Sequence, residues 1–186
     1  HYSKNLPGEK WKGLTITNNY LELLEDKSLD AVLIATPDHW HGEATIRAAR
    51  AKKHVYCEKP ISLTMQAGRA MANAVKENKV VFQTGSQQRT QYGGKFRRTV
   101  EMVRSGAIGE LKKIRVCVGN PPVRCDLPTE PVPSGIDWDA WQGPAPVRGY
   151  NKILCPDDVH NHFPAWRRYR EYCNGGLADM GAHHFD

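Results

Sequence analysis

The stretch from Asp30 to Pro60 constrains the fold of this chain more than any other, because it has the pattern of strand, turn, helix and strand. Residues 31–35 form a continuous apolar run without alternation, which is typical of a parallel strand covered on both faces. An alanine-rich segment with the composition of a helix follows, and residues 54–57 form a second short strand. The stretch is therefore predicted to be one βαβ unit.

Polar residues stand at the end of each predicted strand in this unit. Ligands of open parallel sheets bind beyond the carboxyl ends of the strands. We therefore expect one ligand crevice to be bordered by Thr36, Pro37, His41, Glu58 and Lys59. Asp38 follows the first strand and is predicted to cap the helix.

The same pattern continues along the chain. A second helix is predicted over residues 64–78, and residues 80–84 are predicted to form the next buried strand. The polar residues that follow, including Gln88, would reach the same crevice. Apolar residues at helical spacing over 96–103 predict a third helix, which ends at Gly106. Two successive βαβ steps predict an α/β fold with a doubly wound parallel sheet.

The pattern changes after the third helix. Residues 113–118 alternate between basic and apolar side chains, which is typical of a strand with one face in water. We therefore predict two domains, at residues 1–108 and at 109–186.

A proline-rich segment occupies much of the second predicted domain. Residues 119–165 contain nine of the twelve prolines, too many for helices or central strands. The aromatic side chains of Trp138, Trp141 and Tyr150 favour packing over disorder. We expect this segment to form a wall over the crevice.

Composition excludes several classes of protein. The 186 residues are 40% hydrophobic, and no apolar run approaches the ~18 residues of a membrane helix. The net charge of +6 is scattered along the chain, which argues against a groove for nucleic acid. Five cysteines without a CxxC pair favour reduced thiols and a cytoplasmic location, although a lost export signal would change that location.

Asp179 and His183 are four residues apart, a spacing that places both on one face of a helix. A carboxylate beside an imidazole fixes its tautomer and raises its basicity, which suits removal of a proton from a hydroxyl. Such a pair is more often structural, and a single lysine such as Lys59 is more often a solvated side chain.

Metal binding is a competing hypothesis for the C-terminal segment. It has five potential ligands within a short span, namely His160, His162, Cys173, His183 and His184. Their spacing is a poor match to the two tight ligand pairs of zinc sites, so we expect no metal. The motifs GxSxG, HExxH and GxxxxGK[ST] do not occur, so the corresponding hydrolase and P-loop functions find no support.

Three motifs in order carry a resemblance to a known family. They are ATPDHWH at 35–41, EKP at 58–60, and WR at 166–167 followed by NGGLADMGAHHFD at 174–186. Together they resemble the glucose-fructose oxidoreductase, inositol dehydrogenase and rhizopine-catabolism (Gfo/Idh/MocA) family. The segment GIDWDAWQGPAP resembles a branch common in sugar-degrading bacteria of the Bacteroidetes and Planctomycetes type.

The resemblance implies an NAD(P)-dependent dehydrogenase. It implies an incomplete Rossmann domain, followed by the start of an α/β domain with an open, mostly antiparallel sheet. Lys59 matches the lysine near the nicotinamide and the substrate, Asp179 and His183 match the rest of the catalytic set, and His183 is the usual proton acceptor. The positions expected to contact the cofactor, NAD or NADP, are Thr36, Pro37, His41, Glu58, Lys59, Gln88, Trp166 and Arg167. The family's EKP turn further predicts a cis bond before Pro60.

The resemblance also implies what this chain lacks and what it binds. The glycine-rich first βαβ unit of the family is missing, so we interpret the chain as an internal fragment. Asn174 stands where the family often has a third glycine. We expect a small carbohydrate or polyol substrate, no nucleic-acid or membrane partner, and a homo-oligomer when the protein is full length. The alternatives are an NAD-retaining glycoside hydrolase and a non-catalytic binding module.

Overall fold

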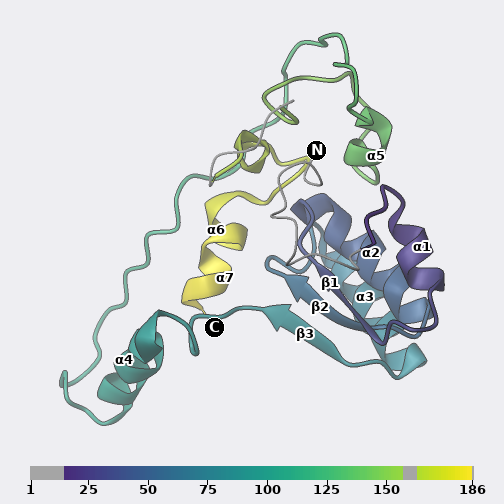
Figure 1. The fold of residues 1–186 in the computed structure, drawn as a ribbon. Coiled ribbons are helices and arrows are strands. Elements are labelled where there is room, and N and C mark those ends of the chain that lie inside the picture. The colour runs from purple at the N-terminus through teal and green to yellow at the C-terminus, as the bar shows by residue number, and fades with distance from the viewer. Residues whose placement is uncertain (1–14, 157–162, 186) are drawn as a thin grey trace, which may run out of the picture.

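The computed structural model describes residues 15–156 and 163–185 of the chain. Three strands, β1 (Ala31–Ile34), β2 (His54–Glu58) and β3 (Phe82–Gly85), form one parallel sheet in the order β1-β2-β3 (Figure 1). The two successive βαβ units predicted from the sequence are therefore present. No helix in these ranges is long and apolar enough to cross a membrane.

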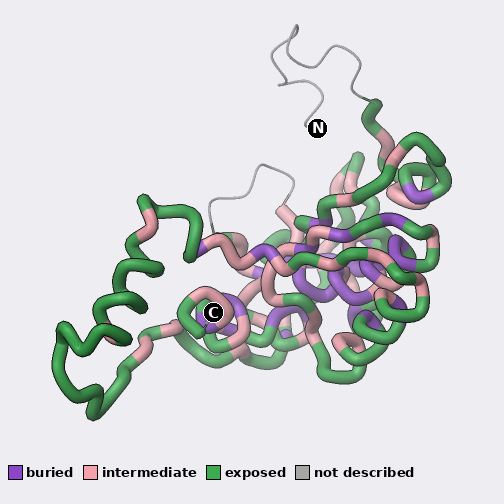
Figure 2. Tube along the Cα trace, turned by 90° about the horizontal axis from the view of Figure 1, so that it is seen from below, coloured by how far each residue is buried: buried purple, intermediate pink, exposed green. Residues whose placement is uncertain are grey.

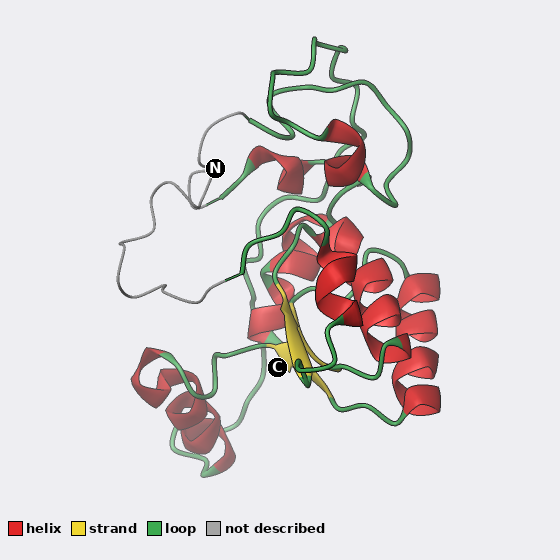
Figure 3. Cartoon of the chain, turned by 45° about the vertical axis from the view of Figure 1, so that its right-hand side comes forward, coloured by secondary structure: helices red, strands yellow, loops and turns green. Residues whose placement is uncertain are grey.

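The helices of the two units cover one face of the sheet. They are α2 (Asp38–Arg50) and α3 (Met65–Asn78), which pack against each other on the same side (Figure 3). Both lie there because successive crossovers in a sheet of order β1-β2-β3 have the same right hand. On the other face Leu33 is 68% exposed. The described residues therefore leave Leu33 uncovered on this face.

The core of this region lies between the sheet and α2. Ile34, Val55 and Cys57 point to the helices, where Ala44 and Ala48 meet them. Small side chains on α2 allow its backbone to approach the strands closely. The short helix α1 (Tyr20–Glu25) contributes Leu24 to the same cluster.

Of the three helices α1, α2 and α3, two have an N-terminus that is capped by a side chain. Thr64, where the second helix was predicted to begin, caps α3, because its hydroxyl accepts a hydrogen bond from the Ala67 amide at 3.1 Å. Asn19 caps α1 in the same way. Asp38, however, is the first residue of α2 and not its cap. The N-cap is Pro37, and the Asp38 side chain is buried elsewhere.

The third predicted helix is present as α4 (Lys95–Arg104), which follows the short 3-10 helix η3 (Tyr92–Gly94). Its residues are mostly exposed, and Figure 2 shows it extending away from the rest of the chain. The strand predicted over 113–118 does not form, and Ile114 is 71% exposed. A strand needs a neighbour to accept its hydrogen bonds, and the described residues provide none for this segment.

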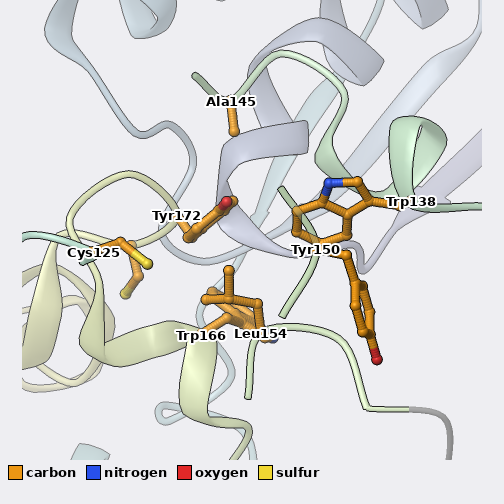
Figure 4. Close-up of a cluster of buried hydrophobic side chains, with 8 residues drawn as sticks. Cys125, Trp138, Ala145, Tyr150, Leu154, Trp166 and Tyr172 are labelled. Atoms are coloured by element: carbon orange, nitrogen blue, oxygen red, sulfur yellow. The ribbon is translucent and has the colours of Figure 1, made fainter. Parts of the chain in front are cut away.

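The described part of the proline-rich segment packs around an aromatic cluster (Figure 4). The rings of Trp138 and Trp141 stack with centroids 5.1 Å apart, and Trp138 donates its indole N–H to the Arg148 carbonyl at 2.9 Å. Tyr150 and Tyr172 are almost fully buried beside them. The expected packing of this segment is therefore confirmed.

Four short helices complete the second region. They are α5 (Trp138–Gln142), η4 (Ala165–Arg168), α6 (Gly175–Asp179) and α7 (Gly181–His184). The described residues here make a single isolated bridge, Val123 with Tyr169, and it is parallel. The predicted antiparallel sheet is therefore not formed by this part of the chain.

Candidate active site

The site is organised by an ion pair between residues 120 positions apart. Lys59 follows β2 and Asp179 ends α6, and the Lys59 ammonium donates to the Asp179 carboxylate and to the Asp179 backbone carbonyl, the latter at 3.1 Å. The two side chains are only 12% and 2% exposed. Two charges removed from water in this way are stable only as a pair, so the contact ties α6 to the carboxyl end of the sheet.

A second cation lies on the other oxygen of the same carboxylate. Arg167 places Nε 3.3 Å from Asp179 Oδ2. Its guanidinium lies over the Trp166 ring at 4.4 Å and near the Phe163 ring at 5.1 Å, so aromatic faces fix the plane of the charge. Asp179 is therefore oriented by Lys59 and Arg167 together.

His183 lies beside this pair with a buried and unpartnered ring nitrogen. Among the described residues no group forms a hydrogen bond with its Nδ1. Burial lowers the pKa of His183, and the Lys59 charge lowers it further, whereas Asp179 acts in the opposite direction. A neutral imidazole is the form that can accept a proton.

The predicted pairing of Asp179 with His183 is not the one that the structure forms. The carboxylate oxygens of Asp179 face Lys59 and Arg167 instead. In addition, α6 ends at Asp179 and α7 begins at Gly181, so the two residues are not on one continuous helix. Tertiary neighbours therefore replace the partner that the sequence spacing suggested.

These side chains border one cavity of about 500 Å³. A volume of this size is ordinary for a small-molecule site. The polar groups that line it are Glu58, Lys59, Gln87, Gln88, Gln91, Arg167, Asp179, His183 and His184, and the aromatic ones are Tyr92, Phe96 and Phe163. The expected convergence of Lys59, Asp179 and His183 in one crevice is therefore observed.

The residues expected to contact a cofactor fall into separate groups. Glu58, Gln88 and Arg167 line the same cavity as Lys59. Thr36 and Pro37 instead border an apolar hollow of about 760 Å³ beside β1, between α1, α2 and α5.

His41 has a different environment from the one expected. It is buried, with Nδ1 2.6 Å from the Pro60 carbonyl and Nε2 2.9 Å from the Thr36 carbonyl. Both ring nitrogens are thus used to join the ends of β1 and β2. The bond between Lys59 and Pro60 is cis, as predicted. Trp166 is also buried, and its ring lies under the Arg167 guanidinium without lining the cavity.

Two further polar residues, Gln87 in the cavity and Asp38 at the start of α2, have contacts that the sequence did not predict. Gln87 donates from Nε2 to the Glu58 carboxylate at 2.7 Å and to the Tyr56 hydroxyl at 3.0 Å, which fixes the position of Glu58. Asp38 is buried, which raises its pKa to about 6, and it accepts a hydrogen bond from the Cys173 thiol. Gln87 is one of the polar residues after the third strand that were predicted to reach the crevice, and it does line the cavity. The sequence carried no signal for the burial of Asp38, because an acid after Thr-Pro has the pattern of an exposed helix cap.

The metal hypothesis finds no support in the described residues. Residues 15–156 and 163–185 contain no group of three or more potential ligands. Two of the five candidate ligands, His160 and His162, lie outside the described residues.

Two models of one protein family match this chain. Residues 3–86 match the model described as an oxidoreductase family with an NAD-binding Rossmann fold, and residues 115–186 match the model of that family's C-terminal alpha/beta domain. The chain therefore belongs to the Gfo/Idh/MocA family of oxidoreductases. The predicted domain boundary at residue 108 lies between the two matched regions.

The matches to curated proteins and solved structures cover about half of this chain. It is 37% identical over 100 residues to the myo-inositol 2-dehydrogenase of Thermotoga maritima, a match over 54% of this chain and 29% of that protein. It is 39% identical over 89 residues to the 2,7-anhydro-N-acetylneuraminate hydratase of Escherichia coli, which covers 48% of this chain and 23% of the relative. A crystal structure of an NAD-binding protein from Listeria innocua aligns at 38% identity with a TM-score of 0.49, over 54% of this chain and 29% of that one. The matched part thus spans less than a third of each relative.

Proposed function

We propose that this chain carries the reacting part of an NAD(P)-dependent dehydrogenase that acts on a CH–OH group of a sugar, polyol or sugar derivative. The observation that carries the proposal is the contact between Lys59 and Asp179 in a cavity that His183 also lines. The NAD-binding Rossmann family and a relative named for an inositol dehydrogenase support it.

In the proposed mechanism each polar side chain has a distinct role. His183 accepts the proton of the substrate hydroxyl, because burial beside Lys59 favours the neutral imidazole. The Lys59 ammonium stabilises the negative charge that develops on the substrate oxygen. Asp179 holds that ammonium in place, and Arg167 lies on the other oxygen of the same carboxylate. A bound nicotinamide supplies the hydride acceptor or donor.

The residues of the cavity fit the nicotinamide end of the cofactor. Its walls combine aromatic rings with amide and charged groups, which is the mixture expected around a planar carboxamide and a hydroxylated ring. Glu58, Gln88 and Arg167 would hold this end, with Trp166 acting through Arg167. Thr36 and Pro37 would contact the cofactor further along the strand ends.

Net reduction of the cofactor tests this proposal most simply. In the protein that contains this chain, sugars or polyols added with NAD⁺ or NADP⁺ should produce a steady rise in absorbance at the wavelength of the reduced cofactor. Lys59→Ala should abolish that rise, whereas Lys112→Ala, at an exposed site, should leave it unchanged. Consumption of substrate without net NAD(P)H would contradict the proposal.

A second candidate is a reaction without net redox change in which the cofactor stays bound. The 39% identical relative that is named as a hydratase favours it. An NAD-retaining glycoside hydrolase is the form of this candidate that the sequence suggested. Product analysis separates it from the dehydrogenase, because its products have the same oxidation level as the substrate.

We further propose a cytoplasmic location and a homo-oligomeric protein. The first is supported by five unpaired cysteines, of which three are buried. The second is supported by apolar side chains on α4 that remain exposed, such as Val100 at 45% and Met102 at 50%. Light scattering on the purified protein tests the oligomeric state.

A further inference from the structure

The Asn174 side chain adds a second connection between the two matched regions beside the ion pair. Asn174 donates a hydrogen bond from Nδ2 to the Leu63 carbonyl at 2.5 Å, across 111 positions of sequence. Leu63 follows Lys59 by four residues, and Asn174 precedes Asp179 by five. The loop that begins at Lys59 and the segment that ends at Asp179 are therefore connected at both ends, by this hydrogen bond and by the ion pair.

The turn that contains Asn174 has little freedom to move by itself. Gly175 has φ +68°, and a Cβ built on it would lie 2.5 Å from Pro122 Cδ. A Cβ on Gly176 would lie 1.9 Å from the Val118 carbonyl oxygen, and the Gly176 amide donates to Asn120 at 2.9 Å. The backbone of the turn thus lies directly against residues 118–122, so a displacement of Asn174 is passed to α6 and its last residue.

The preceding residue anchors the other side of the turn. The Cys173 thiol donates to the carboxylate of Asp38 at the start of α2, and both side chains are buried. This contact positions the start of the turn on α2, but it does not reach the loop after Lys59. Among the described side chains, the hydrogen bonds between that loop and the turn come from Asn174 alone.

We propose that Asn174 is a positioning residue, which holds the loop after Lys59 at the distance from α6 that keeps the Lys59 ammonium on the Asp179 carboxylate. The inference rests on the proposed function only in naming Lys59 as a catalytic residue. The acceptor on the loop is a carbonyl oxygen, so the tether requires a donor at position 174. Asn174→Asp keeps the shape of the side chain but places an acceptor against that carbonyl, and Asn174→Ala removes the contact.

Acylation of lysine amines, followed by mass spectrometry, tests the effect of the hydrogen bond between Asn174 and Leu63 without substrate or cofactor. Lys59 is largely buried by its ion pair, so a weaker tether exposes its amine. Lys53 is the internal control, because it is 4% exposed and donates to the Leu29 carbonyl at 2.8 Å in the same region, away from the turn. Both variants should raise the labelling rate of Lys59 about five-fold, as expected for the loss of one hydrogen bond, and leave that of Lys53 unchanged.

Two results would overturn the proposal. An unchanged Lys59 rate in both variants would mean that the ion pair needs no tether. Equal increases at Lys59 and Lys53 would mean that the substitutions loosen the whole region, so that Asn174 is only structural. Because the labelling needs no turnover, a failure of the proposed dehydrogenase activity leaves this test interpretable.

Discussion

At the scale of single residues, burial decides what the charged groups of the site can do. Asp179 is 2% exposed and meets two cations, so it serves as a fixed anion that orients Lys59 and Arg167. Within the part of the chain that the structure describes, His183 Nδ1 has no hydrogen-bond partner, and the pKa of His183 is lowered by burial and then by Lys59. Lys59 therefore does two things: it pairs with the Asp179 carboxylate, and its charge favours the neutral form of the His183 imidazole.

The pKa of His183 gives a prediction that NMR can check. Titration of the imidazole signals, assigned with His183→Gln, should give a pKa below the ordinary 6.5, and Lys59→Met should raise it by removing the second cause of the shift. Because the folded pKa is the lower one, the stability that His183 contributes is fully present above pH 6.5. It is lost as the pH falls through the folded pKa. A pKa of His183 above 6.5 would contradict this account.

The motif residues of the site were predictable from the sequence, but their partners were not. Lys59, Asp179 and His183 were found because three motifs occur in one order. The spacing of Asp179 and His183 suggested that they pair, whereas Arg167 and Lys59 occupy the carboxylate. A partner more than a hundred residues away leaves no trace in local spacing.

At the scale of elements, local signals predicted the positions of the helices better than the side chains that cap them. Thr64, where the second helix was predicted to begin, caps α3, whereas Asp38, which was predicted to cap α2, is the first residue of that helix. The strand expected at 113–118 is not formed. Alternation of basic and apolar side chains indicates which face of a strand would be buried, but it does not supply the neighbouring strand that a sheet requires. Leu33 is exposed for a similar reason. A continuous apolar run indicates a strand that is buried on both faces, but it does not supply the elements that cover those faces.

The cap of α3 gives a prediction at this scale. Thr64→Ala removes the acceptor of the Ala67 amide and should lower the free energy of unfolding by about 1 kcal/mol in urea denaturation. Thr64→Ser keeps a hydroxyl acceptor and is the matched control. A loss of equal size in both variants would show that the hydroxyl bond is not the source of the stability.

At the scale of the whole molecule, two matched regions meet through a few polar contacts near the carboxyl end of β2. The ion pair of Lys59 with Asp179, the Asn174 tether and the bond of Cys173 with Asp38 all connect them. The His39 imidazole and the Trp40 indole add two contacts at 3.0 Å to the Trp141 carbonyl of α5. The described part of the proline-rich segment is thereby fixed against the start of α2, where Asp137, Ala140 and Trp141 border the apolar hollow that Thr36 and Pro37 also line.

The central claim is that Lys59 and His183 act on the reacting atoms. Steady-state turnover and cofactor affinity of Lys59→Ala and His183→Ala, measured in the protein that contains this chain, test it most directly. The account predicts that turnover falls by a factor of at least ~100 while the dissociation constant of the cofactor changes by less than about ten-fold, because both groups act in the transition state. Equal losses of turnover and of cofactor affinity would contradict it and would make both residues structural.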